Sequence, residues 1–201
     1  IVFISLMGCN DVLDTTDSSA FGEDLIYSDP TQVEKLVFNV YNSTESWSVD
    51  RFEWWGRRQN IENSSFESKF NFNNLDLFSD QAGWTPSNNA GLLKDKWRNY
   101  FYYIRLANEF LDRIDQSGAM QKNPDKVNIL KAEMKFLRAN AYSSLIKYYG
   151  GVTIFDHAYG LNDDFNISRN SYEECVDFII KDLNEAAAVL PPTRPNSEYG
   201  R

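Results

Sequence analysis

The fold is decided by residues 123–151, NPDKVNILKAEMKFLRANAYSSLIKYYGG. Their apolar residues recur at intervals of three and four, which is the period of one face of an α-helix. Asn123 suits the N-cap, Pro124 suits the first helical position, and Gly150-Gly151 end the pattern. We therefore predict a helix over residues 124–149 whose buried stripe is Leu130, Met134, Leu137, Ala141, Leu145 and Tyr148.

Two segments before this stretch carry the same helical period. The first follows Asp29 and Pro30, which suit an N-cap and a first helical position. The second runs from about Gly91 to Ser117, and we expect Gly118 to end it. Their predicted stripes are Val33, Leu36, Val37, Val40 and Tyr41, and then Leu93, Trp97, Phe101, Ile104, Ala107, Leu111 and Ile114.

A fourth helix is predicted after residue 151. It begins at Ser171, which forms a capping box with Glu174, and it ends before Pro191-Pro192. Its predicted stripe is Val176, Ile180, Leu183, Ala187 and Leu190, and Cys175 lies beside that stripe as an expected buried, inert thiol.

The second and third predicted helices contain a weak internal sequence similarity. Residues 104–108 (IRLAN) resemble residues 137–141 (LRANA) at an offset of 33, close to the tetratricopeptide period of about 34 residues. Two copies do not prove a repeat, but stacked antiparallel helix pairs are the simplest architecture. We therefore predict an all-α fold of tetratricopeptide-like helix pairs with a long irregular, aromatic-rich insertion between the first and second helices.

That insertion, residues 45–88, is the most informative region for function. It holds four of the five tryptophans, and irregular connections of such length are uncommon and usually functional. An aromatic ring can stack on the apolar C–H face of a sugar while polar neighbours bind its hydroxyls. The alternative is that most of these rings anchor the insertion to the helices. The candidate ligand-binding residues are Trp54, Trp55 and Trp84, with Arg57, Arg58 and Asn60 as polar partners.

Composition argues against several classes of function. The chain carries 29 acids and 20 bases, for a net charge of −9, without a basic stripe, so we expect no nucleic-acid partner. One histidine and two cysteines predict no His/Cys metal cage, no disulfide framework and no cofactor. His157 has no Gly-x-Ser-x-Gly partner, and no phosphate-binding loop occurs. Many carboxylate pairs could serve glycoside hydrolysis, but nothing singles out two of them, so we expect no enzyme.

The N-terminal residues indicate a targeting sequence. Residues 1–8 are almost wholly apolar and are interpreted as the remainder of a secretory signal peptide. Leu6-Met7-Gly8-Cys9 resembles a bacterial lipobox, which makes Cys9 the predicted lipidation site, because the thiolate takes up the lipid. The alternative is an apolar strand with an incidental cysteine. Residues 9–28 are then a polar leader, and the lipid anchor is the expected contact with the membrane.

Several motifs together resemble the SusD/RagB family of outer-membrane nutrient-binding lipoproteins. Residues 9–14, CNDVLD, resemble the start of its mature proteins, and residues 97–108 resemble its W-x-x-x-Y-x-x-I-x-x-A-N helix, with the tyrosine shifted or supplied by Phe101. The most specific match is AEMKFLRA at residues 132–139, followed by Tyr142 and YGGV at residues 149–152. Arg169, DFIIKDL at residues 177–183 and Leu190-Pro191 complete it, whereas Thr153 replaces a common proline.

The resemblance implies a function as well as a fold. Members of the family are longer, so residues 29–201 correspond to an N-terminal helical domain whose C-terminal continuation is absent. The resemblance implies a surface-exposed, lipid-anchored outer-membrane protein that binds a glycan and passes it to a TonB-dependent, SusC-like transporter. It also implies that Arg138 and Arg169 are structural and pair with carboxylates or helix carbonyls. The alternative is a helical-repeat scaffold that binds peptides or proteins.

Overall fold

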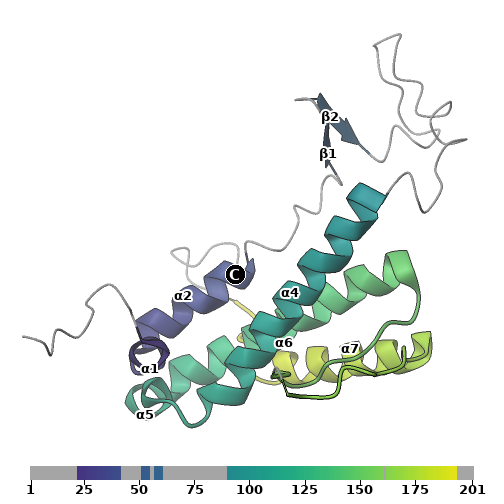
Figure 1. The fold of residues 1–201 in the computed structure, drawn as a ribbon. Coiled ribbons are helices and arrows are strands. Elements are labelled where there is room, and N and C mark those ends of the chain that lie inside the picture. Colours follow the sequence, from purple (N-terminus) through teal and green to yellow (C-terminus); the bar gives the residue numbers. More distant parts are fainter. Residues whose placement is uncertain (1–21, 42–50, 55–56, 61–89, 161, 194–201) are drawn as a thin grey trace, which may run out of the picture.

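The computed structural model describes residues 22–41, 51–54, 57–60, 90–160 and 162–193. This part of the chain is helical, as predicted, with one short strand pair (Figure 1). The helices are α1 (Glu23–Tyr27), α2 (Pro30–Tyr41), α4 (Ala90–Ile114), α5 (Gly118–Lys122), α6 (Pro124–Tyr149) and α7 (Tyr172–Ala187), and the strands are β1 (Arg51–Trp54) and β2 (Arg57–Asn60).

The caps of α6 and α7 follow the sequence signals. The Asn123 side chain accepts a hydrogen bond from the Lys126 N–H at 3.1 Å, and Pro124 is the first residue of α6. Gly150 ends α6 at φ 69°, a left-handed conformation that favours glycine. At α7 the Ser171 hydroxyl and the Glu174 carboxylate form the predicted capping box. The predicted bounds of α6 are therefore confirmed.

The end of α4 differs from the prediction. The helix stops at Ile114 rather than Ser117, because the Ser117 hydroxyl accepts from the Met120 N–H and caps α5 instead. Gly118, the expected terminator, begins α5. A Cβ at this position would lie 3.2 Å from the Ser28 Cα, so glycine allows the α1–α2 turn to approach α5.

Helix α6 is central, and its neighbours on either side run antiparallel to it. It packs against α2, α4, α5 and α7. Asp115, just after α4, pairs with Lys131 of α6, and Asn108 of α4 pairs with Arg138 further along α6, so the two helices run in opposite directions. Lys135 pairs with Glu185 of α7, and Arg138 pairs with Asp182, which shows the same relation. These are the predicted antiparallel pairs.

One end of the bundle is built mainly from buried aliphatic side chains. Val33 and Val37 of α2, Ile114 of α4 and Leu130 and Met134 of α6 meet here, each at most 1% exposed. We call this cluster the aliphatic core; its other members are Val40, Ala107, Phe110, Ala119, Val127 and Leu137. This burial confirms the predicted stripe on α2 and the first half of the stripe on α6, whose last predicted member, Tyr148, is only partly buried.

The other end of the bundle is richer in aromatic rings. Tyr100 and Ile104 of α4 pack with Tyr142 and Leu145 of α6 and with Cys175 of α7, which is buried as predicted. Rings at its margin are only partly buried: Phe101, Tyr149, Phe155 and Phe178. We call this cluster the aromatic region.

The predicted register of α7 is wrong by one residue. Its buried residues are Cys175, Ile179, Asp182 and Ala186, whereas Ile180 is 49% and Leu183 is 36% exposed. The reason is Asp182, an acid that faces inward because Arg138 of α6 neutralises it. A prediction from the apolar pattern places such an acid on the surface, and the predicted buried face of α7 is therefore displaced by one residue.

Within the insertion, β1 and β2 form an antiparallel pair. Arg51 lies opposite Asn60, and Trp54 lies opposite Arg57. This regular pairing was not expected in a segment predicted to be irregular. None of the helices in the described ranges is long and apolar enough to cross a membrane.

Candidate functional site

The segment that joins α6 to α7, residues 150–160 and 162–171, folds back across α4. We call it the α6–α7 connection. Its two ends meet, because the Val152 carbonyl accepts from the Asn170 N–H at 3.1 Å and the Asn170 side chain accepts from the Ile154 N–H at 3.0 Å. Gly151 allows this approach, since a Cβ there would lie 2.2 Å from the Asn170 carbonyl oxygen.

A buried polar network fixes the middle of the connection. Arg138 donates to both carboxylate oxygens of Asp182, at 2.7 and 2.8 Å, and to the Asn108 side-chain oxygen at 2.6 Å. The same guanidinium donates to the Asp156 carbonyl at 3.1 Å. The Asn108 amide donates to the carbonyls of Phe155 and His157, both at 2.9 Å. The connection is thus attached to α4 and α6 through the backbone carbonyls of residues 155–157.

Tyr142 completes this attachment from α6. Its hydroxyl oxygen accepts from the Phe155 N–H at 2.7 Å, and the hydroxyl donates to the Phe155 carbonyl at 3.2 Å. Burial raises the pKa of the Tyr142 hydroxyl well above its ordinary value. It therefore stays protonated at every physiological pH and keeps both hydrogen bonds.

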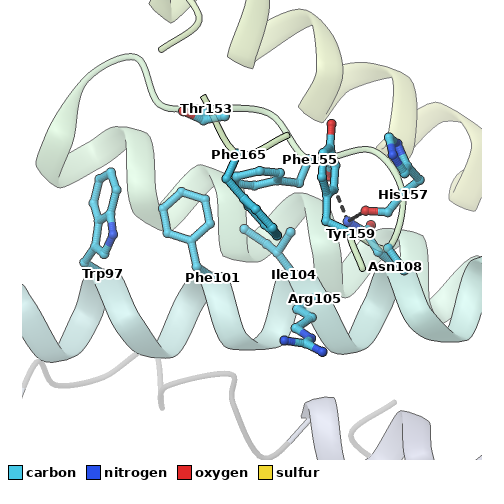
Figure 2. A pocket seen from close by; sticks show the side chains of 11 residues that line it. Trp97, Phe101, Ile104, Arg105, Asn108, Thr153, Phe155, His157, Tyr159 and Phe165 are labelled. Carbon is cyan, nitrogen blue, oxygen red and sulfur yellow. Dashed lines mark hydrogen bonds between the residues drawn. The ribbon is translucent and has the colours of Figure 1, made fainter. Parts of the chain in front are cut away.

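A pocket of about 310 Å³ lies between α4 and the connection. Figure 2 shows Trp97, Phe101 and Ile104 rising from successive turns of α4 toward the connection, which contributes Phe155 and Phe165. Its remaining lining residues are Arg105, Asn108, Thr153, His157, Ala158 and Tyr159.

The rings around this pocket form a continuous series of contacts. The Trp97 and Phe101 centroids lie 4.7 Å apart, Phe101 meets Phe155 at 5.8 Å, and Phe155 meets Tyr159 at 5.1 Å. Tyr159 then contacts Phe165 at 5.8 Å and stacks on His157 at 4.3 Å. Trp97 stays 37% and Phe165 59% exposed, so the series presents apolar ring surface to solvent.

Two acidic residues, Asp156 of the connection and Asp112 of α4, adjoin residues that line the pocket. Asp156 lies 2.7 Å from the His157 Nδ1, and this hydrogen bond lowers the pKa of the Asp156 carboxyl below its ordinary value. The Asp112 carboxylate of α4 accepts from the Ala158 N–H at 2.7 Å. Arg105, the basic residue in the lining, donates to Glu109 at 2.7 Å.

The residues singled out in the sequence lie elsewhere. Trp54 occupies the end of β1, and Arg57, Arg58 and Asn60 belong to β2, where Arg58 is opposite Glu53. The strand pair brings the backbones of these four residues together. Trp55, Trp84 and Cys9 lie outside the described residues. The ligand-binding and lipidation assignments therefore stay predictions.

The expected roles of the two arginines are confirmed. Arg138 pairs with the Asp182 carboxylate. Arg169 donates to the Tyr149 carbonyl at the end of α6, at 3.4 Å, and its guanidinium lies 5.7 Å from the Trp97 ring centroid. The pocket itself was not predicted. Its signal in the sequence is the repeated aromatic residues of the connection, Phe155, Tyr159 and Phe165, which follow no helical or strand period.

The fold defines the class of protein: an all-α, tetratricopeptide-like arrangement of antiparallel helix pairs with an aromatic surface on one side. A family model described as starch-binding and associating with the outer membrane matches residues 11–199. The chain belongs to this SusD-like family, within the SusD/RagB group.

Known relatives agree with this assignment. Two SusD-like proteins of Formosa agariphila, P2 and P25, are 22% and 21% identical to this chain and match 96% and 100% of it. The crystal structure of a SusD-like protein from Bacteroides fragilis superposes with a TM-score of 0.65, at 26% identity over 90% of this chain and 33% of that one. A SusD-like carbohydrate-binding protein of the same organism gives a TM-score of 0.66 at 23% identity, over 88% of this chain and 35% of that one.

The match covers only part of each relative. The chain spans 37% of the length of P2 and 38% of the length of P25.

Proposed function

We propose that this protein binds an oligosaccharide or polysaccharide nutrient at the cell surface and delivers it to a TonB-dependent, SusC-like outer-membrane transporter, without catalysing a reaction. The observation that carries the proposal is the family match over residues 11–199, whose description is starch-binding and associated with the outer membrane. The carbohydrate-binding description of the Bacteroides fragilis neighbour supports the same class of ligand.

The proposed ligand contacts include the strand pair of the insertion. Trp54 is the last residue of β1, Trp55 follows it in the sequence, and Arg57, Arg58 and Asn60 belong to β2. A ring can supply a stacking face, and guanidinium and amide groups can supply hydrogen bonds to hydroxyls. In this proposal Trp54, Trp55 and Trp84 are ligand platforms and the three polar residues are their partners.

Glycan-array binding with the full-length protein tests the ligand class. We expect selective binding of one group of oligosaccharides. Trp54→Ala should weaken that binding by roughly 1–3 kcal/mol, by analogy with bases that stack on aromatic residues, while the melting temperature stays unchanged. Trp54→Phe is the matched control, because it keeps a stacking face. An array on which no glycan binds the wild-type protein would contradict the proposal.

The lipid anchor requires a separate test. Cys9 is proposed to carry the lipid, since it follows Leu6-Met7-Gly8. We expect the wild-type precursor to partition into detergent and to label with palmitate, and Cys9→Ala to do neither. Labelling that persists in the Ala variant would exclude Cys9 as the site.

Delivery to a transporter predicts a physical complex. The full-length protein should co-purify from outer membranes with a TonB-dependent partner, and transport of the bound glycan should stop when the protein is deleted. Uptake that continues at the wild-type rate after deletion would argue against delivery.

A further inference from the structure

The pocket between α4 and the α6–α7 connection has the dimensions of a site for a single ring. Its volume of about 310 Å³ lies at the lower end of the range for small-molecule sites, about 300–1,000 Å³. Its walls are ring faces and edges from two elements, α4 and the connection, and Figure 2 shows these rings converging on one space. A ligand with at least one apolar face would match such walls.

The polar groups at the base of the pocket are already engaged. Asn108 donates both of its amide hydrogens to the carbonyls of Phe155 and His157, and its side-chain oxygen accepts from Arg138. A hydroxyl buried against this base would lose its hydrogen bonds to water, which is costly. The ligand must therefore turn an apolar face inward and keep its hydroxyls toward the open side.

The open side carries groups that can meet hydroxyls. His157 has a half-exposed side chain and uses its Nδ1 toward Asp156, which leaves Nε2 on the other side of the ring. The Thr153 hydroxyl lies at the pocket edge and makes a long contact, 3.5 Å, with the Ser168 carbonyl. A pyranose ring has this division of surfaces, with C–H groups on its faces and hydroxyls around its rim.

The charges near the pocket select against an acidic sugar. The Asp112 carboxylate accepts from the N–H of the lining residue Ala158, and the Asp156 carboxylate contacts the Nδ1 of the lining residue His157. The basic groups nearby are already engaged: Arg105 of the lining pairs with Glu109, and Arg169, whose guanidinium lies 5.7 Å from the Trp97 ring centroid, donates to the Tyr149 carbonyl. A uronate carboxylate would approach two like charges, whereas a neutral pyranose would not.

We propose that this pocket is a second sugar-binding site, separate from the strand pair of the insertion, that takes one neutral pyranose unit with its apolar face against Trp97, Phe101 and Phe165. The proposal rests on the proposed function, since it assumes that the protein meets glycans.

Trp97 provides a local probe for the test. The full-length protein is labelled with 5-fluorotryptophan, and the Trp97 ¹⁹F resonance is assigned by its loss in Trp97→Phe. Methyl β-D-glucopyranoside and methyl β-D-glucuronide are then titrated separately. We expect a saturable shift of the Trp97 resonance with the neutral glucoside at millimolar concentrations, and at least a tenfold weaker response to the glucuronide.

Two variants control for indirect effects. Phe165→Ala removes an exposed ring of the pocket and should reduce the Trp97 shift at least tenfold. Phe136→Ala removes a ring of α6 that is 40% exposed and outside the pocket, and it should leave the shift unchanged. A Trp97 resonance that no neutral pyranoside moves, that responds equally to the glucuronide, or that still shifts in Phe165→Ala would overturn the proposal.

The outcome is independent of the test of the proposed function. If the glycan array is positive and sensitive to Trp54→Ala while Trp97 does not respond, the pocket proposal fails and the proposed function stands. If the array shows no binding, the proposed function fails whatever Trp97 does.

Discussion

The two ends of the helical bundle differ in how completely their side chains are buried. In the aliphatic core, Val33, Val37 and Ile114 are completely buried, and Leu130 and Met134 are at most 1% exposed. In the aromatic region, Tyr142 is buried but the neighbouring rings of Trp97, Phe101 and Phe155 remain partly accessible. One end excludes water with side chains that have no polar atoms, and the other leaves ring faces uncovered.

This difference between the aliphatic core and the aromatic region indicates that folding stability and ligand recognition depend on different parts of the bundle. Burial of aliphatic side chains is the main source of folding free energy. The aromatic region instead uses the polar groups of Arg138, Asn108 and Tyr142 to position a segment without regular structure. Rings on a fixed backbone can be left exposed without collapse of the pocket, which is the condition for a preformed binding surface.

The largest expected effect follows from breaking the polar network that holds the aromatic region. Arg138→Ala would leave Asp182, which is 1% exposed, as an uncompensated buried charge. We expect a loss of about 3–5 kcal/mol in the free energy of unfolding. Urea denaturation measures it. The double variant Arg138→Met, Asp182→Leu removes both charges and should recover most of the loss; a single variant as stable as wild type would show that the pair is not needed.

The aliphatic core should respond strongly to a cavity. Leu137 lies on the predicted stripe of α6 and is 2% exposed, so the register of this helix is confirmed. Leu137→Ala should cost about 2–5 kcal/mol, the range for core leucines that lose their side chains. A thermal melt checks this. Phe136→Ala, at an exposed neighbour, is the control and should change little, and equal effects of the two variants would contradict the separation of buried and exposed faces.

A smaller loss of stability is expected where the two ends of the α6–α7 connection pack against each other at Gly151. Gly151→Ala would place a Cβ 2.2 Å from the Asn170 carbonyl oxygen and 2.9 Å from the Ser171 carbonyl carbon, both backbone atoms that cannot swing away. We expect a loss of about 1–3 kcal/mol, as for overpacked sites. Gly160→Ala is the matched control, since the nearest atom to its Cβ would be an Asp163 carboxylate oxygen at 3.7 Å. Comparable denaturation midpoints for the two variants would show that the ends of the connection are not tightly apposed.

The smallest expected effect concerns the partly buried α6–α7 ion pair of Lys135 and Glu185. The hydrogen bond from Lys135 lowers the pKa of the Glu185 carboxyl below its ordinary value of 4.5. Because the folded-state pKa is lowered, the pair stabilises the protein fully above pH 4.5, and this contribution is lost as the pH falls through the folded-state pKa. Glu185→Gln should slightly lower the free energy of unfolding near pH 7 and leave it almost unchanged at the acid end, so that stability declines less steeply in acid than in wild type. A decline in acid that is as steep in Glu185→Gln as in wild type would exclude a contribution from this carboxyl.

The sequence predicts most of this helical scaffold because its signals are local. Asn123 and Ser171 cap their helices as expected, and the stripe on α6 is buried from Leu130 to Leu145. The register of α7 could not be predicted, because the inward position of Asp182 depends on Arg138, which lies 44 residues away in the chain. A buried ion pair is a tertiary property, and an apolar pattern treats each of its members as a surface residue.

The candidate pocket was beyond sequence reasoning for a related reason. Phe155, Tyr159 and Phe165 lie in a segment without a period. The backbone of Phe155 is held by hydrogen bonds to Asn108 and Tyr142, and Tyr159 and Phe165 follow it in the series of ring contacts. Trp97 and Phe101 were expected in the buried stripe of α4, yet Trp97 is 37% exposed at the pocket. The helical period of the sequence predicts which face of α4 each ring occupies. The path of the α6–α7 connection determines whether that face is buried.

One paired measurement tests the separation of stability from recognition most directly: a thermal melt and a Trp97 ¹⁹F titration with methyl β-D-glucopyranoside, both on Leu137→Ala and on Phe165→Ala. We predict that Leu137→Ala lowers the melting temperature by about 2–4 °C for each kcal/mol lost. At temperatures below its melting temperature, this variant should keep the Trp97 ¹⁹F shift of wild type. Phe165→Ala should show the reverse, with an unchanged melt and a Trp97 response reduced at least tenfold. Two variants that lose stability and response together would contradict the account.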